Sequence, residues 1–555
     1  MNTRTTTEAE RLKLQTACDA AKTPFERNRL GQFATPSLLA SDILDHARRL
    51  LPMDMPVRFL DPGIGTGSFY AALLGAFSTS CIAAATGFEI DPHYGEPART
   101  LWQDYPLDIR LDDFTRALPP PPSGRYNLIV CNPPYVRHHH LEPAEKIRLQ
   151  QATAAACGVR LGGLAGLYCH FMGLGHPWLA EDGIAAWLIP SEFMDVNYGG
   201  ALKKYLLTQV ELLRVHRFDP KELQFADALV SSAVIWFRKR RPTIGHTVEF
   251  TFGGTHAKPT HTRIVPVSAL HAEAKWTRFP LEDVRAATNG LRLDDFFKIQ
   301  RGLATGDNQF FIMTREQIAA RKLPHEFFKP ILPSPRYVTV DEIEANPDST
   351  PKLERQLFML DCRLAEDDIK NRYPDLYAYL ETGKPAVSER YLCHSRSPWY
   401  SQENRPPAPI VCTYMGRDLK RGRPIRFILN RSQATAANVY LMLYPKPNLA
   451  RAMESDPTIL QKVWTYLNDI DMSSLLGEGR VYGGGLYKME PKELANVPAE
   501  AIASLLPNDT CQPRRAVQET LWPLDQVWER RSTQYLEQPV RETPDSNTDT
   551  KGIPI

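Results

Sequence analysis

The chain has 555 residues, which is too long for one ordinary hydrophobic core, so two or three domains are expected. Its 66 Lys and Arg residues balance 64 Asp and Glu residues, so an acidic partner would have to meet basic residues gathered locally. The nine Cys residues form no CxxC pair and no apolar run is long enough to span a membrane, which argues against a zinc ribbon, a disulfide scaffold or a membrane protein. We therefore expect a cytoplasmic protein without a bound metal.

The first 36 residues contain a polar segment and a short motif. Residues 1–30 predict a helical lead-in or lid. The motif Gly31-Gln32-Phe33-Ala34-Thr35-Pro36 follows, and as a bare pattern Thr35 caps a helix whose first turn holds Pro36.

A glycine-rich turn follows the first predicted strand, residues 57–60. The turn and helix start read Asp61-Pro62-Gly63-Ile64-Gly65-Thr66-Gly67-Ser68-Phe69. The spacing GxGxG differs from the GxGxxG of dinucleotide sites, and no P-loop lysine follows. An adenosine ligand with an amino-acid tail fits this turn better, with Asp61 available to its ammonium group.

The next two predicted strands each end in an acidic residue. Residues 83–88 lead into Glu89 and Ile90, and a carboxylate at this position binds a ribose diol in doubly wound folds. Residues 109–111 lead into Asp113 and Phe114, which suit an adenine amino group and an adenine ring face.

The strand Leu128–Cys131 runs directly into Asn132-Pro133-Pro134-Tyr135, around which the chain is organised. Prolines fix the turn, so the Asn132 carboxamide and the Pro133 carbonyl are held at the strand end. Two neighbouring acceptors suit an exocyclic amine with two N–H groups, and Tyr135 offers a flat face. Taken alone, the motif is equally a strand followed by a Pro-Pro turn.

The glycine-rich turn, the acidic strand ends and the motif at 132–135, in this order, resemble the class I S-adenosylmethionine-dependent methyltransferases. Among these, the chain is most similar to the gamma-class, TaqI-like adenine-N6 DNA methyltransferases, over residues 31–240 and more loosely 294–498. The resemblance implies an α/β, Rossmann-like domain with a mixed seven-stranded sheet, followed by an α+β target-recognition domain. It also implies S-adenosylmethionine as cofactor and double-stranded DNA as partner.

The resemblance assigns roles to individual residues. The catalytic group comprises Asn132, Pro133, Pro134, Tyr135 and Phe225, where Phe225 stacks on an extruded adenine opposite Tyr135; the alternative is a core Phe. The cofactor would be held by Thr35, Asp61, Gly63, Gly65, Phe69, Glu89, Ile90, Asp113, Phe114 and Asn132.

Three patterns after the catalytic motif have competing interpretations. Arg137 is predicted to contact DNA, and His138 to His140 to bind no metal, because neighbouring residues do not share a face. The apolar spacing over residues 164–174 favours a core-facing helix over a cofactor surface.

The second half contains a concentrated basic stretch opposed in sequence only by Asp418. Together with Arg137, the predicted DNA-binding residues are Arg417, Lys420, Arg421, Arg423, Arg426 and Lys488; the alternative is a solvated hairpin. A nuclease pattern at Asp375, Glu381 and Lys384 is imperfect, because its last two residues are spaced ExxK where ExK is expected.

We therefore predict five segments and one activity. The segments are a lead-in at 1–30, a methyltransferase domain at 31–240, a connecting segment at 241–293, a target-recognition domain at 294–510 and a helix with a polar tail at 511–555. The activity is site-specific methylation of adenine N6 by a monomer, as the modification enzyme of a restriction-modification system whose endonuclease acts separately. The alternatives are cytosine-N4 transfer, RNA or protein-glutamine methylation, and a non-catalytic DNA-binding subunit.

Overall fold

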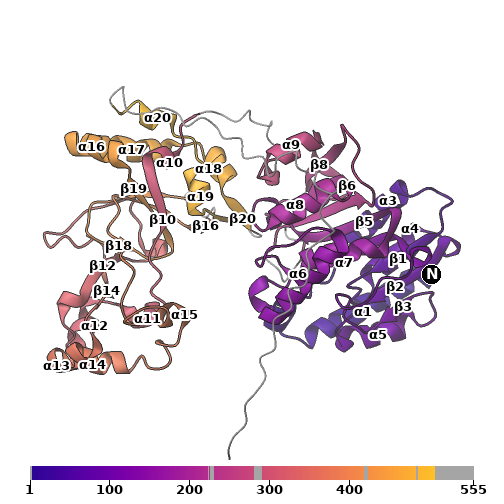
Figure 1. Cartoon of the computed structure of the whole chain (residues 1–555), viewed down its shortest axis with the longest axis horizontal. Coiled ribbons are helices and arrows are strands. Elements are labelled where there is room, and N and C mark those ends of the chain that lie inside the picture. The colour runs from indigo at the N-terminus through magenta and orange to yellow at the C-terminus, as the bar shows by residue number, and fades with distance from the viewer. Residues whose placement is uncertain are drawn as a thin grey trace, which may run out of the picture.

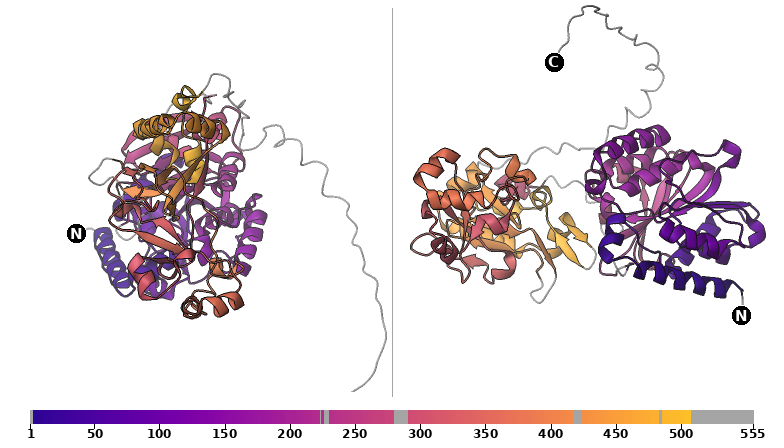
Figure 2. Two further views of the ribbon diagram at one scale, coloured as in Figure 1. Left: turned by 90° about the vertical axis from the view of Figure 1, so that its left-hand side faces the viewer. Right: turned by 90° about the horizontal axis from the view of Figure 1, so that it is seen from below.

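Two lobes make up the computed structural model, which describes residues 3–222, 224–225, 230–279, 290–417, 423–482 and 485–506. The N-terminal lobe comprises residues up to 279 and the C-terminal lobe begins at residue 290 (Figure 1). The two lobes are separate bodies in a second direction of view as well (Figure 2). No helix of the described residues is long and apolar enough to cross a membrane.

A nine-stranded mixed sheet forms the centre of the N-terminal lobe, with strand order β3-β2-β1-β4-β5-β7-β6-β8-β9. Strands β1 to β5 pair in parallel, and β7 is antiparallel to both of its neighbours. The first seven strands in this order confirm the predicted Rossmann-like methyltransferase fold. Residues 247–266, assigned above to the connecting segment, add β8 and β9 to the same sheet through parallel pairing of β8 with β6.

The bounds of these elements follow the predicted strands and helices closely. The strands are β1 Val57–Asp61, β2 Ile82–Phe88, β3 Asp108–Arg110, β4 Tyr126–Cys131, β5 Leu179–Pro190, β6 Glu211–Arg217, β7 Ser232–Arg238, β8 Thr247–Gly254 and β9 Pro259–Pro266. The helices are α1 Thr3–Ala20, α2 Pro24–Leu30, α3 Ser37–Leu50, α4 Ser68–Ala76, α5 Pro92–Trp102, α6 Pro143–Cys157, α7 Leu167–Gly175, α8 Gly199–Thr208 and α9 Val267–Ala272. Short 3-10 turns are η1 Thr79–Cys81, η2 Pro122–Gly124, η3 His138–His140, η4 His176–Trp178, η5 Ser191–Met194 and η6 Trp276–Arg278.

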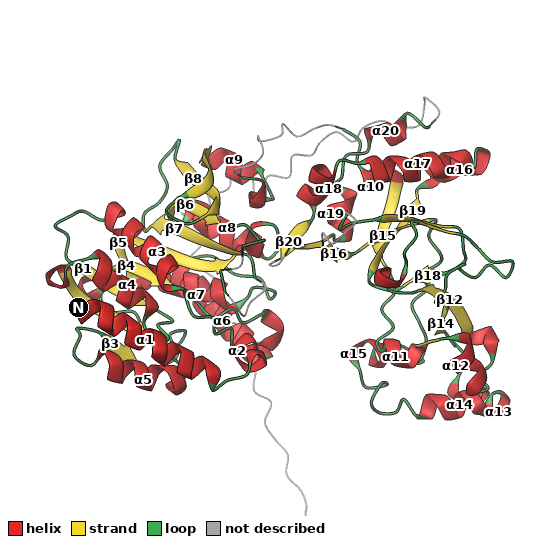
Figure 3. Cartoon of the chain, turned by 180° about the vertical axis from the view of Figure 1, so that it is seen from behind, coloured by secondary structure: helices red, strands yellow, loops and turns green. Residues whose placement is uncertain are grey.

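Helices cover both faces of this sheet, so each central strand is apolar on both sides (Figure 3). Strand β4 shows the alternation: Leu128 and Val130 join the core beneath α3 and α4, whereas Ile129 and Cys131 join the core beneath α7 and α8. A parallel strand buried in this way ends abruptly at its carboxyl edge, where the next residues are free to form a site.

Three smaller sheets build the C-terminal lobe, in the orders β10-β19-β15-β17-β13, β11-β14-β12-β18 and β16-β21-β20. Its strands are β10 Phe297–Arg301, β11 Ile312–Met313, β12 Phe328–Leu332, β13 Glu342–Ile343, β14 Leu357–Leu360, β15 Ile410–Thr413, β16 Met415–Arg417, β17 Phe427–Asn430, β18 Thr435–Ala436, β19 Tyr440–Pro445, β20 Arg480–Tyr482 and β21 Leu486–Lys488. Its helices are α10 Leu293–Phe296, α11 Asn308–Phe311, α12 Arg315–Ala320, α13 Glu366–Arg372, α14 Pro374–Glu381, α15 Tyr391–His394, α16 Pro447–Ser455, α17 Thr458–Asp469, α18 Met472–Glu478, α19 Pro491–Ala495 and α20 Glu500–Ala503, with 3-10 turns η7 His325–Phe327 and η8 Pro335–Tyr337. The sheet of β16, β21 and β20 reaches toward the N-terminal lobe (Figures 1 and 3).

Candidate active site

The loop after β4 holds the side chain of Asn132 in one orientation. Its Nδ2 donates to the Phe33 carbonyl oxygen at 2.9 Å and to Thr35 Oγ1 at 3.1 Å. A carbonyl oxygen can only accept, so the NH₂ group faces Phe33 and the carboxamide oxygen faces away from it. That oxygen, Oδ1, is buried and has no hydrogen-bond partner among the described residues. Because an unpaired buried acceptor costs free energy, this atom points to a ligand that donates N–H groups here.

Thr35 supports Asn132 rather than a helix. Helix α3 begins at Ser37 with Pro36 at the N-cap position and no side-chain hydrogen bond, so the interpretation of Thr35 as a helix cap is wrong. The buried Thr35 hydroxyl instead receives the Asn132 amide. The motif at 31–36 and the motif at 132–135 therefore form one unit, although about a hundred residues separate them.

Gly31 brings these two motifs into contact. The Tyr135 amide donates to the Gly31 carbonyl at 3.2 Å, and a Cβ at Gly31 would lie 2.2 Å from the Tyr135 nitrogen. Gly31 also has φ of 66°, a left-handed conformation that favours glycine. On the other side of the loop, the Tyr135 hydroxyl donates to the Leu188 carbonyl of β5 at 3.1 Å. These contacts fix the loop between two elements.

Phe225, Tyr135 and Phe33 form one aromatic cluster. The Phe225 ring lies 5.9 Å from the Tyr135 ring, at an interplanar angle of 85°, and 5.8 Å from the Phe33 ring. A base stacked between two rings needs them parallel and roughly 7 Å apart, twice the van der Waals spacing. The structure therefore brings Phe225 and Tyr135 together but holds no open slot between them.

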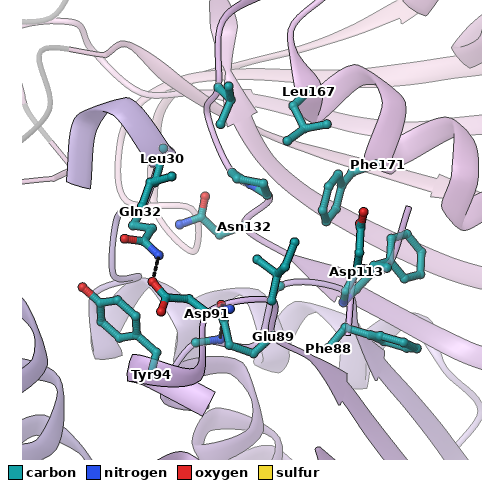
Figure 4. Close-up of a pocket in the computed structure, with 18 of the residues that line it drawn as sticks. Leu30, Gln32, Phe88, Glu89, Asp91, Tyr94, Asp113, Asn132, Leu167 and Phe171 are labelled. Carbon is teal, nitrogen blue, oxygen red and sulfur yellow. Dashed lines mark hydrogen bonds between the residues drawn. The ribbon is translucent and has the colours of Figure 1, made fainter. Parts of the chain in front are cut away.

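A cavity of about 700 Å³ lies on one side of the loop, and we call it the glycine-loop cavity (Figure 4). It is large enough for a nucleoside ligand. Of the predicted cofactor residues, those that line it are Gly63, Gly65, Glu89, Ile90, Asp113, Phe114 and Asn132, and Pro134 of the catalytic group joins them. Three predicted cofactor residues do not line it: Thr35, Asp61 and Phe69.

Glu89 is tied to the glycine loop from the end of β2. Its Oε2 accepts from the Gly65 amide at 3.0 Å and its Oε1 accepts from the Asp91 amide at 2.9 Å. Burial raises the pKa of Glu89. Each carboxylate oxygen keeps a further lone pair, so Glu89 can still accept from a diol.

Asp61 and Phe69 lie beneath the glycine loop. Asp61 is 1% exposed, and its Oδ1 accepts from the Gly63 amide at 3.1 Å. Burial, reinforced by the charge of Glu89, raises the pKa of Asp61 to about 7. Phe69 is a core residue of α4. Both residues shape the turn from below.

The end of β3 supplies the remaining predicted cofactor residues. Asp113 Oδ1 accepts from the Thr115 amide at 2.8 Å and hydroxyl at 2.7 Å, and its Oδ2 pairs with Arg116 at 3.2 Å. Phe114 is buried and Ile90 is exposed at the rim. Both carboxylate oxygens of Asp113 therefore already have partners within the protein before a ligand binds.

Helices α1 and α2, in the segment predicted as a lead-in or lid, close the cavity through contacts that the sequence did not indicate. Lys22 of this segment pairs with Asp91, and Gln32 donates to the same carboxylate at 2.7 Å (Figure 4). Burial opposes ionisation of Asp91, but these hydrogen bonds lower its pKa below the ordinary value. Arg11 anchors α1 to the glycine loop by donating to Thr66 at 3.2 Å. Only Gln32 and Asp91, which sit inside motifs, could have been found from the sequence.

Helix α7 forms another wall of the cavity. Leu167 and Phe171 line it, although both also pack into the hydrophobic core, as predicted for this helix (Figure 4). Tyr168, one residue from Leu167, is buried in the core as predicted. Leu164 precedes the helix and is exposed.

A second cavity, of about 960 Å³, lies on the other side of the loop, between the lobes, and we call it the interlobe cavity. Tyr135 and Arg137 line it from the N-terminal lobe, and Lys488 lines it from β21. The Ser231 hydroxyl donates to the Val481 carbonyl at 3.2 Å across this space. The loop at 132–135 thus separates two cavities of different character.

Known proteins match most of the chain. The family described as Eco57I restriction-modification methylase matches residues 102–224, and the family described as the C-terminal domain of Type II methyltransferase M.Eco57I matches residues 274–526. Type II methyltransferase M.XamI of Xanthomonas campestris pv. amaranthicola is 29% identical over 486 residues, which cover 86% of each chain. M.AccI of Acinetobacter calcoaceticus is 25% identical over 493 residues, which cover 84% of this chain and 85% of that one. The chain belongs to the Type II restriction-modification methyltransferases.

One solved structure shares the fold of this methyltransferase, and a second is a weaker match. The Type IIL restriction-modification enzyme MmeI, solved in complex with DNA, matches with a TM-score of 0.50 and 12% identity over 88% of this chain and 67% of that one. The Type IIG restriction endonuclease BpuSI matches with a TM-score of 0.43 and 15% identity over 90% of this chain. The methyltransferase spans 64% of that longer protein, which is less than two thirds.

One residue of the basic stretch, Arg426, pairs with an acid that lies far away in sequence. Arg426 Nε donates to Asp341 at 2.8 Å, and its other nitrogens donate to the backbone of residues 338–340. Arg423 donates to the Asn468 carbonyl, Arg417 is exposed, and Lys420 and Arg421 lie outside the described residues. Arg426 is therefore a structural residue, whereas Arg417 and Arg423 are exposed in the described part of this stretch.

Two further sequence patterns have simple structural explanations in the methyltransferase. Lys384 pairs with Glu366 at 2.5 Å and with Glu381 at 2.8 Å, so the nuclease-like pattern is a group of surface ion pairs beside α14. His138 to His140 form the 3-10 turn η3. In the described ranges, no group of three His, Cys, Asp or Glu residues is arranged to hold a metal ion.

Proposed function

We propose that this methyltransferase transfers a methyl group from S-adenosylmethionine to N6 of an adenine that is flipped out of double-stranded DNA. The observation that carries this proposal is the buried Oδ1 of Asn132, a residue that lines the glycine-loop cavity; this oxygen has no partner among the described residues. An exocyclic amine is the ligand that satisfies such an acceptor. The family supports methyl transfer, and the matched relatives are Type II methyltransferases.

The glycine-loop cavity fits the cofactor. Gly63 and Gly65 offer backbone at close range, and Glu89 retains lone pairs for the ribose hydroxyls. Phe114 and Ile90 would contact the adenine ring of the cofactor, and Asp113 its amino group. Bound there, S-adenosylmethionine would supply its sulfonium methyl group, and its sulfur would become a neutral thioether.

The protein's own residues prepare the target amine. Asn132 Oδ1 would accept one amino hydrogen and the Pro133 carbonyl the other, which draws the nitrogen lone pair out of conjugation and aims it at the methyl group. After transfer the nitrogen releases one of its hydrogens as a proton to solvent. Phe33 and Thr35 keep the carboxamide from rotating, because they hold its NH₂ group.

Flipping a base costs roughly a few kcal/mol, and stacking on Tyr135 and Phe225 would recover about 1–3 kcal/mol. The three rings at this point are in mutual contact, so their separation accompanies insertion of the base. We propose that the C-terminal lobe reads the DNA sequence, with Arg417 and Lys488 among its contacts to DNA.

Identification of the product tests this proposal. The protein is expressed in a host without DNA methylation, and the modified bases are read by long-read sequencing and by nucleoside mass spectrometry. We expect N6-methyladenine at one short sequence. N4-methylcytosine would contradict the adenine assignment, and methylation of RNA or protein without DNA methylation would contradict DNA as the substrate.

A further inference from the structure

Arg217 ends β6 at the same edge of the sheet as the catalytic loop. Strands β5 and β6 are both antiparallel to β7 and therefore parallel to each other, so their carboxyl ends lie together. Arg217 lines the interlobe cavity, as do Tyr135 of the loop and Ser191 at the end of β5. No pattern in the sequence distinguishes this arginine from the others.

The positive charge of Arg217 has no direct ion-pair partner within the described part of the chain, although the Asp195 and Asp219 carboxylates act on it from beyond ion-pair distance. Its Nε is buried without a hydrogen-bond partner, and no carboxylate of the described residues forms an ion pair with it. The ring of Phe252 lies 4.5 Å from its guanidinium carbon. The nearby Asp195 carboxylate is bound by the Thr277 hydroxyl at 2.7 Å. Leaving a partly buried cation unpaired costs free energy, which an incoming anion would recover.

The other cations of the interlobe cavity divide into two groups. Arg278, Arg480 and Lys488 pair with Glu273 at 2.9 Å, Glu493 at 2.5 Å and Glu490 at 2.8 Å, respectively. Arg137, two residues after the loop, is exposed and has no ion-pair partner among the residues that the structure describes. Arg217 and Arg137 are thus the two arginines of this cavity whose charge is available.

We infer that Arg217 and Arg137 form a binding site for the backbone phosphates beside the flipped nucleotide. The inference rests on the proposed function and deepens it. A fork of N–H donors matches a phosphate, and a phosphate held on either side of the loop fixes the nucleotide while its base reaches Asn132. This site carries no sequence information; it positions the strand.

Arg217→Met and Arg217→Lys test the inference, with Arg48→Met as the matched loss of an exposed arginine that lines neither cavity. Once the methylated sequence is known, kcat and KM are measured on a duplex containing it. For Arg217→Met we expect kcat/KM to fall by about 10- to 100-fold, because a charge-assisted contact is lost. Arg217→Lys should recover part of this loss, while the affinity for S-adenosylmethionine and the melting temperature stay close to those of the wild type.

A change in the substrate provides the second arm. Neutral methylphosphonate linkages flanking the target adenine should lower kcat/KM of the wild type by a similar factor. The same linkages should not lower kcat/KM of Arg217→Met any further. If wild type methylates DNA but Arg217→Met behaves like Arg48→Met, or if the two losses add, the phosphate site is wrong and the proposed function stands. If the wild type methylates no DNA, the proposed function fails and this inference fails with it.

Discussion

The two cavities on either side of the 132–135 loop differ in how their polar groups are satisfied. In the glycine-loop cavity, Asp91 is already bonded to Lys22 and Gln32, and Glu89 is bonded to the loop amides. In the interlobe cavity, Arg137 and Arg217 have no carboxylate partner among the described residues. A site for a small ligand is largely preformed, whereas a site for a polyanion keeps cations available until its partner arrives.

Because of this difference, mutations in the two cavities should have different effects. A change in the glycine-loop cavity should act on cofactor affinity, and a change in the interlobe cavity should act on DNA. The loop contributes residues to both cavities and is held by the motif at 31–36, so a change in the loop or in this motif should act on the chemical step itself.

The largest effect on the loop is expected for Gly31→Ala. The new Cβ would lie 2.2 Å from the Tyr135 nitrogen at a residue with φ of 66°, so the loop has to move. A displacement of about 1 Å is enough to lower kcat by about 10²-fold. Steady-state methyl transfer to duplex DNA measures this loss.

Gly75→Ala is the matched control, because its new methyl group would meet nothing within 4 Å and the residue is exposed on α4. It should leave kcat unchanged. Equal activity of the two variants would show that the contact between the motifs does not position the loop.

Phe225→Leu should have the next largest effect, and only on DNA. Leucine keeps most of the apolar volume but offers no ring to a base, so about 1–3 kcal/mol of stacking is lost. We expect kcat/KM for duplex to fall roughly tenfold or more, with cofactor affinity unchanged. Phe77→Leu, at the end of α4, is the matched control. An unchanged kcat/KM would identify Phe225 as a core residue.

Lys22→Met and Asp91→Asn should act on the cofactor alone. The pair closes the glycine-loop cavity, and residues in direct contact typically show coupling of roughly 0.5–3 kcal/mol. Calorimetric titration with S-adenosylmethionine on both single variants and the double variant measures that coupling. Strict additivity, or a rise in KM for DNA instead, would show that the turn between α1 and α2 does not help to retain the cofactor.

Four buried or partly buried histidines that line neither cavity should set a pH dependence of stability. Burial lowers the pKa of His46 and His216 to about 3, and that of His170 and His176 to about 4. Because the unfolded chain binds protons first, their contribution is complete above about pH 6.5 and is lost as the pH falls below it, at roughly 1.4 kcal/mol per unit for each histidine. Urea unfolding at pH 7.5 and pH 5.5 measures this loss; equal free energies of unfolding would contradict it.

The sequence predicted the glycine-loop cavity well because its residues follow strand ends. Glu89 and Asn132 come directly after parallel strands of one sheet and Asp113 comes shortly after another, so the topology alone brings them together. The capping interpretation of Thr35 failed because it considered only the neighbouring helix, whereas its hydroxyl meets Asn132.

The interlobe cavity was harder to predict because its residues come from both lobes. Arg217 and Lys488 are separated by some 270 positions, and no local spacing connects them. The basic stretch illustrates the converse: counting charges in sequence left Arg426 unopposed, but folding places Asp341 beside it. Ion pairs between residues far apart in sequence decide which cations remain available to a ligand. The periodicity of the sequence does not predict these pairs.

The most direct test concerns the carboxamide of Asn132, in the variants Asn132→Ala and Asn132→Asp, with Asn371→Ala on exposed α13 as the control. Single-turnover methyl transfer and S-adenosylmethionine affinity are measured on the same preparations. We predict that Asn132→Ala slows transfer by about 10²- to 10³-fold or more and leaves cofactor affinity close to that of the wild type, because its oxygen acts on the target amine. Parallel loss of both quantities, or transfer at the rate of Asn371→Ala, would contradict this role.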